Sequence, residues 1–403
     1  MSKVRERLRA IPPCELPRRG MLYDLTAKVF FHRRPAAWLR YCRGGYFEGG
    51  DYDWQASVVG LLGDEAVTHY GVWDVTMRIG TARVRVGGVG AVATHPRRRK
   101  RGLMAVTALD SLRRMEDRGY DMTLLFGIPS FYHRFGYVSA YPSNDYVADV
   151  ERLPSGGPPA GLARFSPGTR RDLDGLYNRQ HARLTGTVVR PTFRQNRDPR
   201  DWRGYLWPGK GRRPAGYVVA GVRRGKLCLF DAAGDPEQIL RAMRRLTERA
   251  GHRKVYFPLL HWRSPLAMRL REGFCRIELR YSRSGGAMIQ TLNLASTLRK
   301  MRGELWRRLK DSRLAGWRGE LLIADARQEV ALKIGPRAIS LGGCGRSRHS
   351  IRGGRHLTQL LIGTDEPGEV IRAGLIRTAG DGRKLAEALF PAQHPMLSRW
   401  DIM

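Results

Sequence analysis

The sequence predicts an α+β protein in which two tandem α/β domains are followed by a third α/β domain. Three observations support this fold class. A strand, a cationic turn and an amphipathic helix follow one another within residues 84–115. Residues 162–285 repeat the first half in outline, because a helix, a Gly, a strand, a short helix and a Gly-aromatic pair follow one another both in residues 115–137 and in residues 246–274, which indicates a duplicated fold. From about residue 287 the arrangement changes, so we expect domains at 1–150, 160–286 and 287–403.

The composition of the 403 residues is that of a globular chain with an unusual excess of cations. The net charge is +35, from 72 Lys and Arg against 37 Asp and Glu. A nucleic-acid-binding protein would explain this charge. Outside one run of five cations, however, the positive residues occur singly or in short pairs, and there is no basic tail. Nucleic-acid binding is therefore the less favoured interpretation.

The cysteines and the apolar segments indicate the cellular compartment in which we expect the protein. Five cysteines are scattered without C-x-x-C spacing, so they indicate neither a disulfide framework nor a metal site: Cys14, Cys42, Cys228, Cys275 and Cys344. The basic N-terminus is not followed by an apolar signal segment. No window approaches the roughly 20 apolar residues of a membrane span. We expect a cytoplasmic protein with reduced cysteines, no metal and no membrane partner.

The central feature of the sequence is a strand at 84–92, five consecutive cations at 97–101, Gly102 and then an apolar-periodic helix. This order presents a helix N-terminus to an anion. The free N–H groups of the first turn, the helix dipole and the cationic side chains all favour a phosphate there, and Gly102 allows close approach of the backbone. A solvated face is less favoured, because the cations lie between a strand and a helix.

A second segment, residues 123–140, indicates a buried strand, a break at Gly127, a short helix and a return strand. Together the two segments resemble the acetyl-CoA core of the GNAT superfamily of N-acetyltransferases. The run Arg99-Lys100-Arg101-Gly102-Leu103 fits the pyrophosphate loop of that family, which has Gly or Ala where this chain has Met104. The other family signature is the spacing of four residues, Phe131, Tyr132, Gly136 and Tyr137.

The resemblance implies acetyl-CoA as co-substrate and assigns its binding residues. Strand residues before the loop would pair with the pantetheine amides, and the loop would hold the pyrophosphate. The implied binding residues are Val92, Ala93, Thr94, Arg99, Lys100, Arg101, Gly102, Leu103, Met104, Ala105, Gly127 and Ile128. In the family, the Tyr of the Phe-Tyr pair lies beside the CoA sulfur and returns a proton to it, which corresponds to Tyr132. The alternative is that Tyr132 only packs.

Residues 1–83 are expected to form the wall that faces the acceptor substrate. A helix at 21–31 and strands at 57–62 and 67–78 flank an aromatic stretch at 38–54. These aromatics fit either a pocket lining or a core. No side chain identifies itself as the catalytic base, although four acids lie near the expected acceptor side: Glu48, Asp51, Asp53 and Glu65.

Residues 162–285 repeat the first half without its chemistry. The Pro- and Gly-rich stretch 151–161 indicates a linker. A helix begun by Asp235-Pro236 and the segment 265–275 echo the core of the first domain. No cationic loop precedes that helix, and no tyrosine replaces Tyr132. We interpret the second domain as a degenerate GNAT fold that cannot hold CoA.

The last third is expected to contain helices at 294–309, 356–362, around 369–372 and 381–389, with strands at 319–325 and 329–334. It resembles the sterol-carrier-like domain that closes members of the Eis (enhanced intracellular survival) branch. That resemblance implies a homo-oligomer such as a hexamer. It also implies that the α-carboxylate of Met403 reaches the acetyltransferase site as general base.

The leading hypothesis is an N-acetyltransferase that moves acetyl from acetyl-CoA to a primary amine. A polycationic aminoglycoside or polyamine requires an acidic cleft, so a protein lysine or a smaller amine is an equal candidate acceptor. Two alternatives remain from other classes. One is a carrier of hydrophobic ligands with a vestigial acetyltransferase domain, and the other is a nucleic-acid-associated protein.

Overall fold

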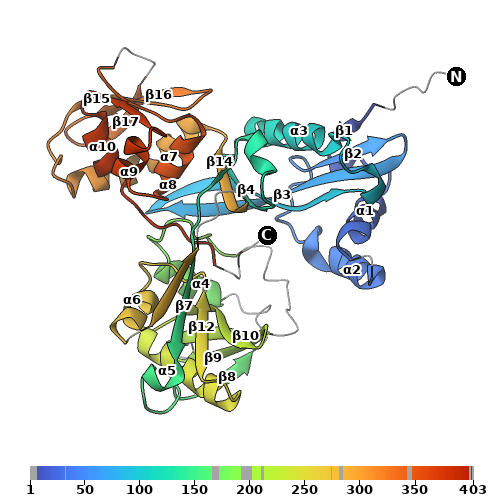
Figure 1. The fold of residues 1–403 in the computed structure, drawn as a ribbon, viewed down its shortest axis with the longest axis vertical. Helices are drawn as coiled ribbons and strands as arrows, with labels where there is room; N and C mark the ends of the chain where they lie inside the picture. Colours follow the sequence, from blue (N-terminus) through green and yellow to red (C-terminus); the bar gives the residue numbers. More distant parts are fainter. Residues whose placement is uncertain are drawn as a thin grey trace.

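The computed structural model describes residues 7–31, 33–165, 172–191, 202–209, 213–273, 275–280, 285–342, 347–398 and 401. Three β-sheets, each covered by helices, form three α/β units, and this confirms the expected fold class (Figure 1). The first and third units lie side by side, and the second lies below them in this view. None of the helices within these ranges combines the length and apolarity that crossing a bilayer requires.

The first sheet has seven strands in the order β1-β2-β3-β4-β5-β14-β6. Its strands are β1 (Arg9–Ile11), β2 (Val58–Leu62), β3 (Glu65–Ile79), β4 (Ala82–Thr94), β5 (Met122–Gly127), β6 (Val138–Ser139) and β14 (Gly286–Thr291). Helix α3 (Leu103–Asp117) covers one face, while α1 (Gly20–Phe30) and α2 (Pro35–Tyr41) cover the other (Figure 1). Successive side chains of β3 point to opposite faces of the sheet. Val72 packs in the apolar cluster that includes the buried side of α3, and Trp73 packs in the cluster that includes the buried side of α1.

The second sheet also has seven strands, in the order β13-β7-β12-β11-β10-β9-β8. They are β7 (Ser143–Asp149), β8 (Ala163–Phe165), β9 (Trp202–Pro208), β10 (Pro214–Arg223), β11 (Lys226–Ala233), β12 (Lys254–Pro258) and β13 (Arg276–Arg280). Its helices are α4 (Asp172–Gln180), α5 (Pro236–Arg249) and α6 (Pro265–Glu272). The apolar side of α5, including Ile239 and Met243, packs into the core of this unit.

The third sheet has five strands in the order β17-β16-β15-β18-β19. They are β15 (Gly319–Ala324), β16 (Glu329–Ile334), β17 (Ile339–Gly342), β18 (His349–Arg352) and β19 (Arg377–Ala379). Its helices are α7 (Leu294–Lys310), α8 (Leu357–Ile362), α9 (Pro367–Arg372) and α10 (Gly382–Leu389). The core of this unit is continuous with that of the first, because Leu298 and Met301 of α7 belong to the same cluster as Val84 and Val86 of β4.

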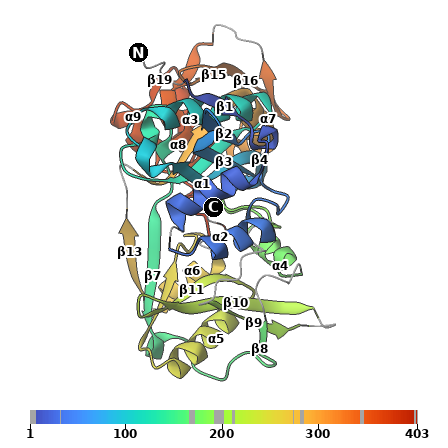
Figure 2. The same cartoon turned by 90° about the vertical axis from the view of Figure 1, so that its right-hand side faces the viewer.

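The first two sheets exchange strands across the expected domain boundaries. β7, which precedes residue 150, pairs with β12 and β13 in the second sheet. β14, which begins at residue 286, returns to the first sheet and pairs with β5 and β6. In Figure 2, β7 and β13 run together from the upper part of the molecule into the lower part. The expected divisions at 150, 160 and 286 remain predictions.

A buried carboxylate joins the third unit to the first. Glu304 of α7 accepts hydrogen bonds from the Thr81 hydroxyl at 2.8 Å and from Arg308 Nε at 2.7 Å. Gly80 makes room for it, since a Cβ at residue 80 would lie 2.1 Å from the Glu304 carboxylate. Burial alone would raise the pKa of Glu304, but the hydrogen bond from Arg307 and the attraction of Arg308 outweigh burial and lower the pKa to about 2.

Replacement of this carboxylate should weaken the joint in a pH-dependent way. The folded-state pKa of Glu304 lies below its value in the unfolded chain, which is about 4.3. Glu304 therefore contributes fully to the free energy of unfolding above about pH 4.3, and this contribution disappears as the pH falls toward 2. At pH 7, Glu304→Gln should lower the unfolding free energy by about 3 kcal/mol, because Arg308 loses its buried partner. Urea denaturation at pH 7 and pH 3 measures this.

The exposed pair of Arg383 with Glu387 on α10 provides the control. Glu387→Gln should cost less than about 0.5 kcal/mol at either pH. An equal cost of Glu304→Gln at pH 7 and pH 3 would contradict the assigned role.

Candidate active site

The site begins where two parallel strands separate. β4 pairs with β5 from Val86↔Met122 to Val89↔Leu125. Beyond that point β4 continues to Thr94 along β3, while β5 ends at Gly127. Across residues 90–94 no described strand pairs with the other edge of β4, so backbone N–H and C=O groups are open to an extended ligand.

A β-bulge shapes the open part of β4. The register with β3 shifts between His69↔Ala93 and Gly71↔Gly90, and Ala91 adopts a left-handed φ of 47°. The imidazole of His69 holds this conformation. Its Nδ1 lies 2.8 Å from the Ala91 carbonyl and its Nε2 lies 2.8 Å from the Tyr52 hydroxyl. Because a carbonyl only accepts, Nδ1 carries the proton and Tyr52 donates to Nε2.

His69 is fully buried and belongs to no sequence motif, so the sequence did not single it out. Burial lowers the pKa of His69 to about 4, despite the hydrogen bond to Ala91, which opposes the shift. The ring therefore stays neutral near pH 7, and its donor and acceptor nitrogens keep fixed roles. We assign His69 to positioning of the bulge.

The N-terminus of α3 closes one end of the slot. Gly102 is its N-cap residue with a left-handed φ of 75°, and among the described residues no side chain caps this end. A Cβ at Gly102 would meet nothing within 4 Å, so the approach is open. The side chain of Met104 is buried in the core beneath α3. The side chain does not cover the end of the helix, so the departure from the family pattern leaves the backbone N–H groups of the first turn accessible.

Tyr132 lies beside the end of β5, on the short helix η4 (Tyr132–Phe135). Its ring packs against Gly127, where a Cβ would lie 2.7 Å from the ring. The ring also contacts Phe131 and Tyr137 edge to face. Burial raises the pKa of Tyr132 to about 12, so the phenol is protonated near neutral pH. Within the described part of the chain no group hydrogen-bonds to its hydroxyl.

A chain of buried hydroxyls fixes the neighbour of Tyr132. The Tyr137 hydroxyl lies 2.9 Å from the hydroxyls of both Tyr70 and Thr123. Thr123 donates to the Gly87 carbonyl at 2.8 Å, so it accepts from Tyr137, which in turn accepts from Tyr70. Burial raises the pKa of Tyr137 and keeps it protonated. The second Tyr of the sequence signature therefore holds the platform on which Tyr132 packs.

The structure brings the expected cofactor residues to one slot. Residues 92–94 lie on the open edge of β4, residues 99–105 form the loop and first turn of α3, and Gly127 with Ile128 lies at the end of β5. Ile128 is 62% exposed beside the slot. The binding role of these residues stays a prediction.

None of the four acids considered as bases is a free carboxylate at the open end of the slot. Three of them already have partners: Glu48 binds Arg19 and Tyr23, Glu65 lies near His95 and Arg98, and Asp53 binds Arg118 and Tyr120. Asp51 lies near Asp74, which pairs across from Gly87 at the closed end of β4. Burial, then repulsion by Asp74, raises the pKa of Asp51 to about 6. Met403 lies outside the described residues.

The aromatic stretch belongs largely to the core. Phe47 is fully buried, stacks on Tyr23 at 5.6 Å and meets Trp73 at 6.0 Å. Trp38 is buried and donates its Nε1–H to Thr26. For these residues the structure favours the core alternative over the pocket lining.

Within the described residues, no group of three or more His, Cys, Asp or Glu could hold a metal ion.

Residues 22–140 match the family model described as "Acetyltransferase (GNAT) domain". They contain the slot, the α3 N-terminus and Tyr132, so the part of the chain that resembles a GNAT acetyltransferase domain is the part that carries the candidate site. Among curated proteins, none matches the chain in sequence.

Solved structures share the fold over almost the full length. A GCN5-related N-acetyltransferase from Anabaena variabilis ATCC 29413 has a TM-score of 0.76 at 16% identity, covering 98% of this chain and 100% of that chain. A GCN5-related N-acetyltransferase from Kribbella flavida has a TM-score of 0.74 at 20% identity, covering 100% of both chains. Eis1 from Mycobacterium abscessus has a TM-score of 0.66 at 14% identity, covering 96% of this chain and 97% of that chain. These likenesses extend the shared fold to all three units.

The anion site at α3 can be tested with two glycines of equal geometry. Gly102 and Gly119 both have a φ of 75° and both have open space around them, but they lie at opposite ends of α3. Acetyl-CoA should raise the Tm of the wild type, since a ligand of the native state stabilises it. Gly102→Asp should abolish most of that increase by placing a carboxylate at the anion site, as thermal shift measurements would show.

Gly119→Asp introduces the same charge and a similar backbone strain, so it should keep the acetyl-CoA shift. Equal shifts for Gly102→Asp and wild type would mean that the anion does not bind at this helix end.

Proposed function

We propose that the chain is an acetyl-CoA-dependent N-acetyltransferase that acts on a primary amine. One observation carries the proposal. Within a GNAT acetyltransferase domain, the open edge of β4 runs from the cationic, uncapped N-terminus of α3 to Tyr132. The helix end suits the diphosphate and the strand edge suits the pantetheine amides. Acetyl-CoA supplies the thioester, and the residues of the chain hold it in place.

In this proposal the amine attacks the acetyl carbonyl carbon directly. A C–N bond forms, the C–S bond breaks, and the thiolate of CoA leaves. The ammonium must lose protons to react, and the sulfur must finally gain one. The slot contributes mainly by orientation, because its backbone groups are fixed by β3 and by the His69 contact before the ligand binds.

We assign the role of acid to Tyr132. Its pKa of about 12 keeps the proton on the phenol until charge develops on the sulfur. A thiolate with pKa of about 8.5 is a weaker base than this phenolate. Tyr132 therefore acts first as a hydrogen-bond donor to the developing thiolate. Transfer of the phenol proton to the thiolate is uphill by this difference in pKa, so it is completed only when the Tyr132 phenolate regains a proton from water.

The acceptor in this proposal is a single amine, either a protein lysine or a small amine. A polycationic acceptor would need free carboxylates along its path. Among the described acids considered for the site, Glu48, Glu65 and Asp53 are each bonded to Arg side chains. This arrangement leaves little negative charge for an aminoglycoside.

For the base we propose the α-carboxylate of Met403. The segment that leads toward it supports this assignment, because Met396, Leu397 and Asp401 are buried. An α-carboxylate has a pKa of about 3.5, so it would act on the minor neutral-amine population or through a water molecule.

We also propose, from the sequence resemblance, a sterol-carrier-like third unit and a homo-oligomeric assembly.

Removal of the Tyr132 proton tests the acid. Tyr132→Phe keeps the ring contacts, so acetyl-CoA affinity should stay nearly unchanged, while kcat should fall about 100-fold or more. Steady-state assays of CoA release measure both parameters. Tyr146→Phe in the second unit is the matched control, because burial also raises the pKa of Tyr146 to about 12. An unchanged kcat in Tyr132→Phe would reduce Tyr132 to a packing role.

Displacement of the terminal carboxylate tests the base. Addition of Gly-Ser-Gly after Met403 should abolish most turnover, because the carboxylate moves by about 10 Å while the docked segment is retained. Acetyl-CoA binding and Tm should not change. Full activity of the extended protein would exclude this base without touching the assignment of the cofactor slot.

A further inference from the structure

The second unit repeats the slot of the first. β11 and β12 are parallel and pair at Leu227↔Val255 and Cys228↔Tyr256, after which β11 continues to Ala233. The register between β10 and β11 shifts between Val219 and Ala220, which places a bulge next to Phe230. The first unit has the same three features in β4 and β5: a short parallel pairing, separation of the strands, and a bulge on the longer strand.

The anion end of this second slot is closed. Asp235 is the N-cap residue of α5, and its carboxylate accepts from the N–H of Gln238 at 3.0 Å. Glu237 adds a second carboxylate to the first turn. Glu237 is paired with Arg241 and Arg269, so it is the Asp235 carboxylate that occupies an N–H group of this helix end and repels a pyrophosphate, in contrast to the uncapped end at Gly102.

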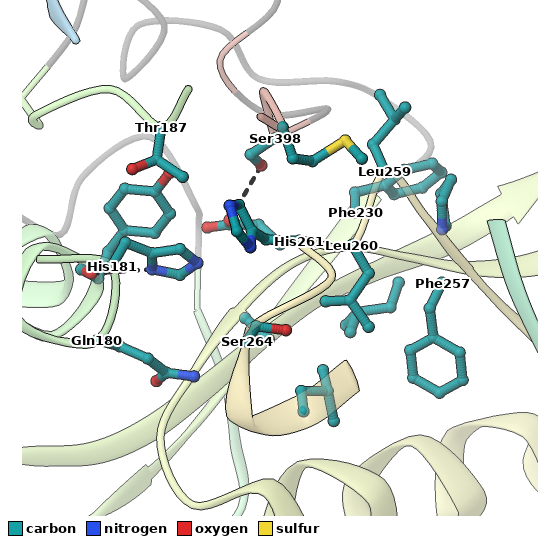
Figure 3. Close-up of a pocket in the computed structure, with 17 residues that line it drawn as sticks. Gln180, His181, Thr187, Phe230, Phe257, Leu259, Leu260, His261, Ser264 and Ser398 are labelled. Atoms are coloured by element: carbon teal, nitrogen blue, oxygen red, sulfur yellow. Dashed lines mark hydrogen bonds between the residues drawn. The ribbon is translucent and has the colours of Figure 1, made fainter. Parts of the chain in front are cut away.

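The C-terminal segment occupies the space between the separated strands. Met396 and Ser398 line the same pocket as Phe230 and Phe257, and only about 50 Å³ remains free. In Figure 3, Ser398 reaches into this pocket near His261 and Phe230. The Ser398 hydroxyl donates to Asp231 at 3.3 Å. The remaining volume holds a few waters, far below the several hundred cubic ångströms of a cofactor site.

A buried arginine fixes the end of this segment. Arg190 bonds Asp231 at 2.7 Å and Asp401 at 2.9 Å, and all three side chains are at most 4% exposed. Tyr217 donates to Asp231 at 2.6 Å and Tyr177 donates to Asp401 at 3.2 Å. Burial alone would lower the pKa of Arg190, but the two carboxylates outweigh it and raise the pKa, so the guanidinium stays charged.

The same arginine is attached to the acetyltransferase domain. The Asn178 side chain accepts from Arg78 of β3 at 2.7 Å and from the Arg190 N–H at 3.0 Å. Its amide donates to the Arg190 carbonyl at 2.6 Å. Val188 also forms a β-bridge with Met77 of β3. The Arg190 cluster therefore lies at the seam between the two units, joined to the strand that flanks β4.

We propose that Arg190 is a positioning residue for acetyl transfer. It holds Asp401, two residues before Met403, and uses the former cofactor slot of the second unit as the dock for the end of the chain. This inference rests on the proposed function, in which that end supplies the base. A carboxylate on a loose terminus would spend little time at the reacting amine, so its fixation contributes directly to turnover.

The test replaces Asp401 by Asn, which keeps the shape and leaves Arg190 paired with Asp231. Backbone amides of residues 392–398 should then exchange hydrogen for deuterium at least 10-fold faster. The kcat should fall about 10-fold or more, with the KM for acetyl-CoA unchanged. Asp311→Asn is the control, since Asp311 forms an exposed ion pair with Arg307. Arg190→Lys is a second variant that keeps the charge but loses the paired contacts to two carboxylates.

The outcomes separate the two proposals. Faster exchange with reduced kcat in a folded variant supports the role of Arg190. Unchanged exchange in both variants overturns it, because the cluster would then not hold the segment. Faster exchange with unchanged kcat also overturns it. In that case the protein extended by Gly-Ser-Gly shows whether the α-carboxylate of Met403 is the base. An inactive extended protein supports that assignment, and an active one excludes it.

Discussion

Separation of β4 from β5 is the constraint on which the candidate site depends. Two parallel strands would normally stay paired along their common length, but the left-handed Ala91 interrupts β4 after four paired residues. The strain at Ala91 is maintained by a neutral imidazole that is itself held by a tyrosine. The slot therefore exists before a ligand arrives, and its backbone groups need no rearrangement to bind one.

The sequence predicted well those elements whose signals are local. Helices at 236–250 and 294–309 carry a 3.6-residue apolar period and side-chain caps at Asp235 and Asn293, and both were found. β14 was missed because its partners, β5 and β6, are more than 140 residues away and its own pattern is short.

The residues of the candidate site also fall into those with a local sequence signal and those without one. The cationic loop with Gly102 and the signature that contains Tyr132 are each a pattern of a few neighbouring residues, so the sequence indicated both. His69 and Arg190 act through partners that lie far away in the chain: Ala91 is 22 residues from His69, and Asp401 is 211 residues from Arg190. A single histidine in a strand and a single arginine in an Arg-rich chain carry no local signal. Only the fold shows what they contact.

Part of the large cationic excess is structural. Arg78, Arg190 and Arg308 are at most 5% exposed. Each lies where two units meet: Arg78 bonds Asn178, Arg190 bonds Asp401, and Arg308 bonds Glu304, which also accepts from Thr81. At such seams a planar guanidinium satisfies several carbonyls and carboxylates at once, which a lysine does not. High positive charge in this chain is thus used for assembly of the units as well as on the surface.

The exchange of β7 and β14 has a consequence for synthesis of the chain. Until residue 291 has emerged, β6 has no partner strand and the outer edge of β5 is unpaired. The first sheet therefore closes only after the second unit has been translated, although the motifs of the candidate site are all present by residue 140. A ribosome-bound fragment that ends near residue 150 carries an open apolar strand edge, which is the form of the chain most exposed to aggregation and to chaperone binding.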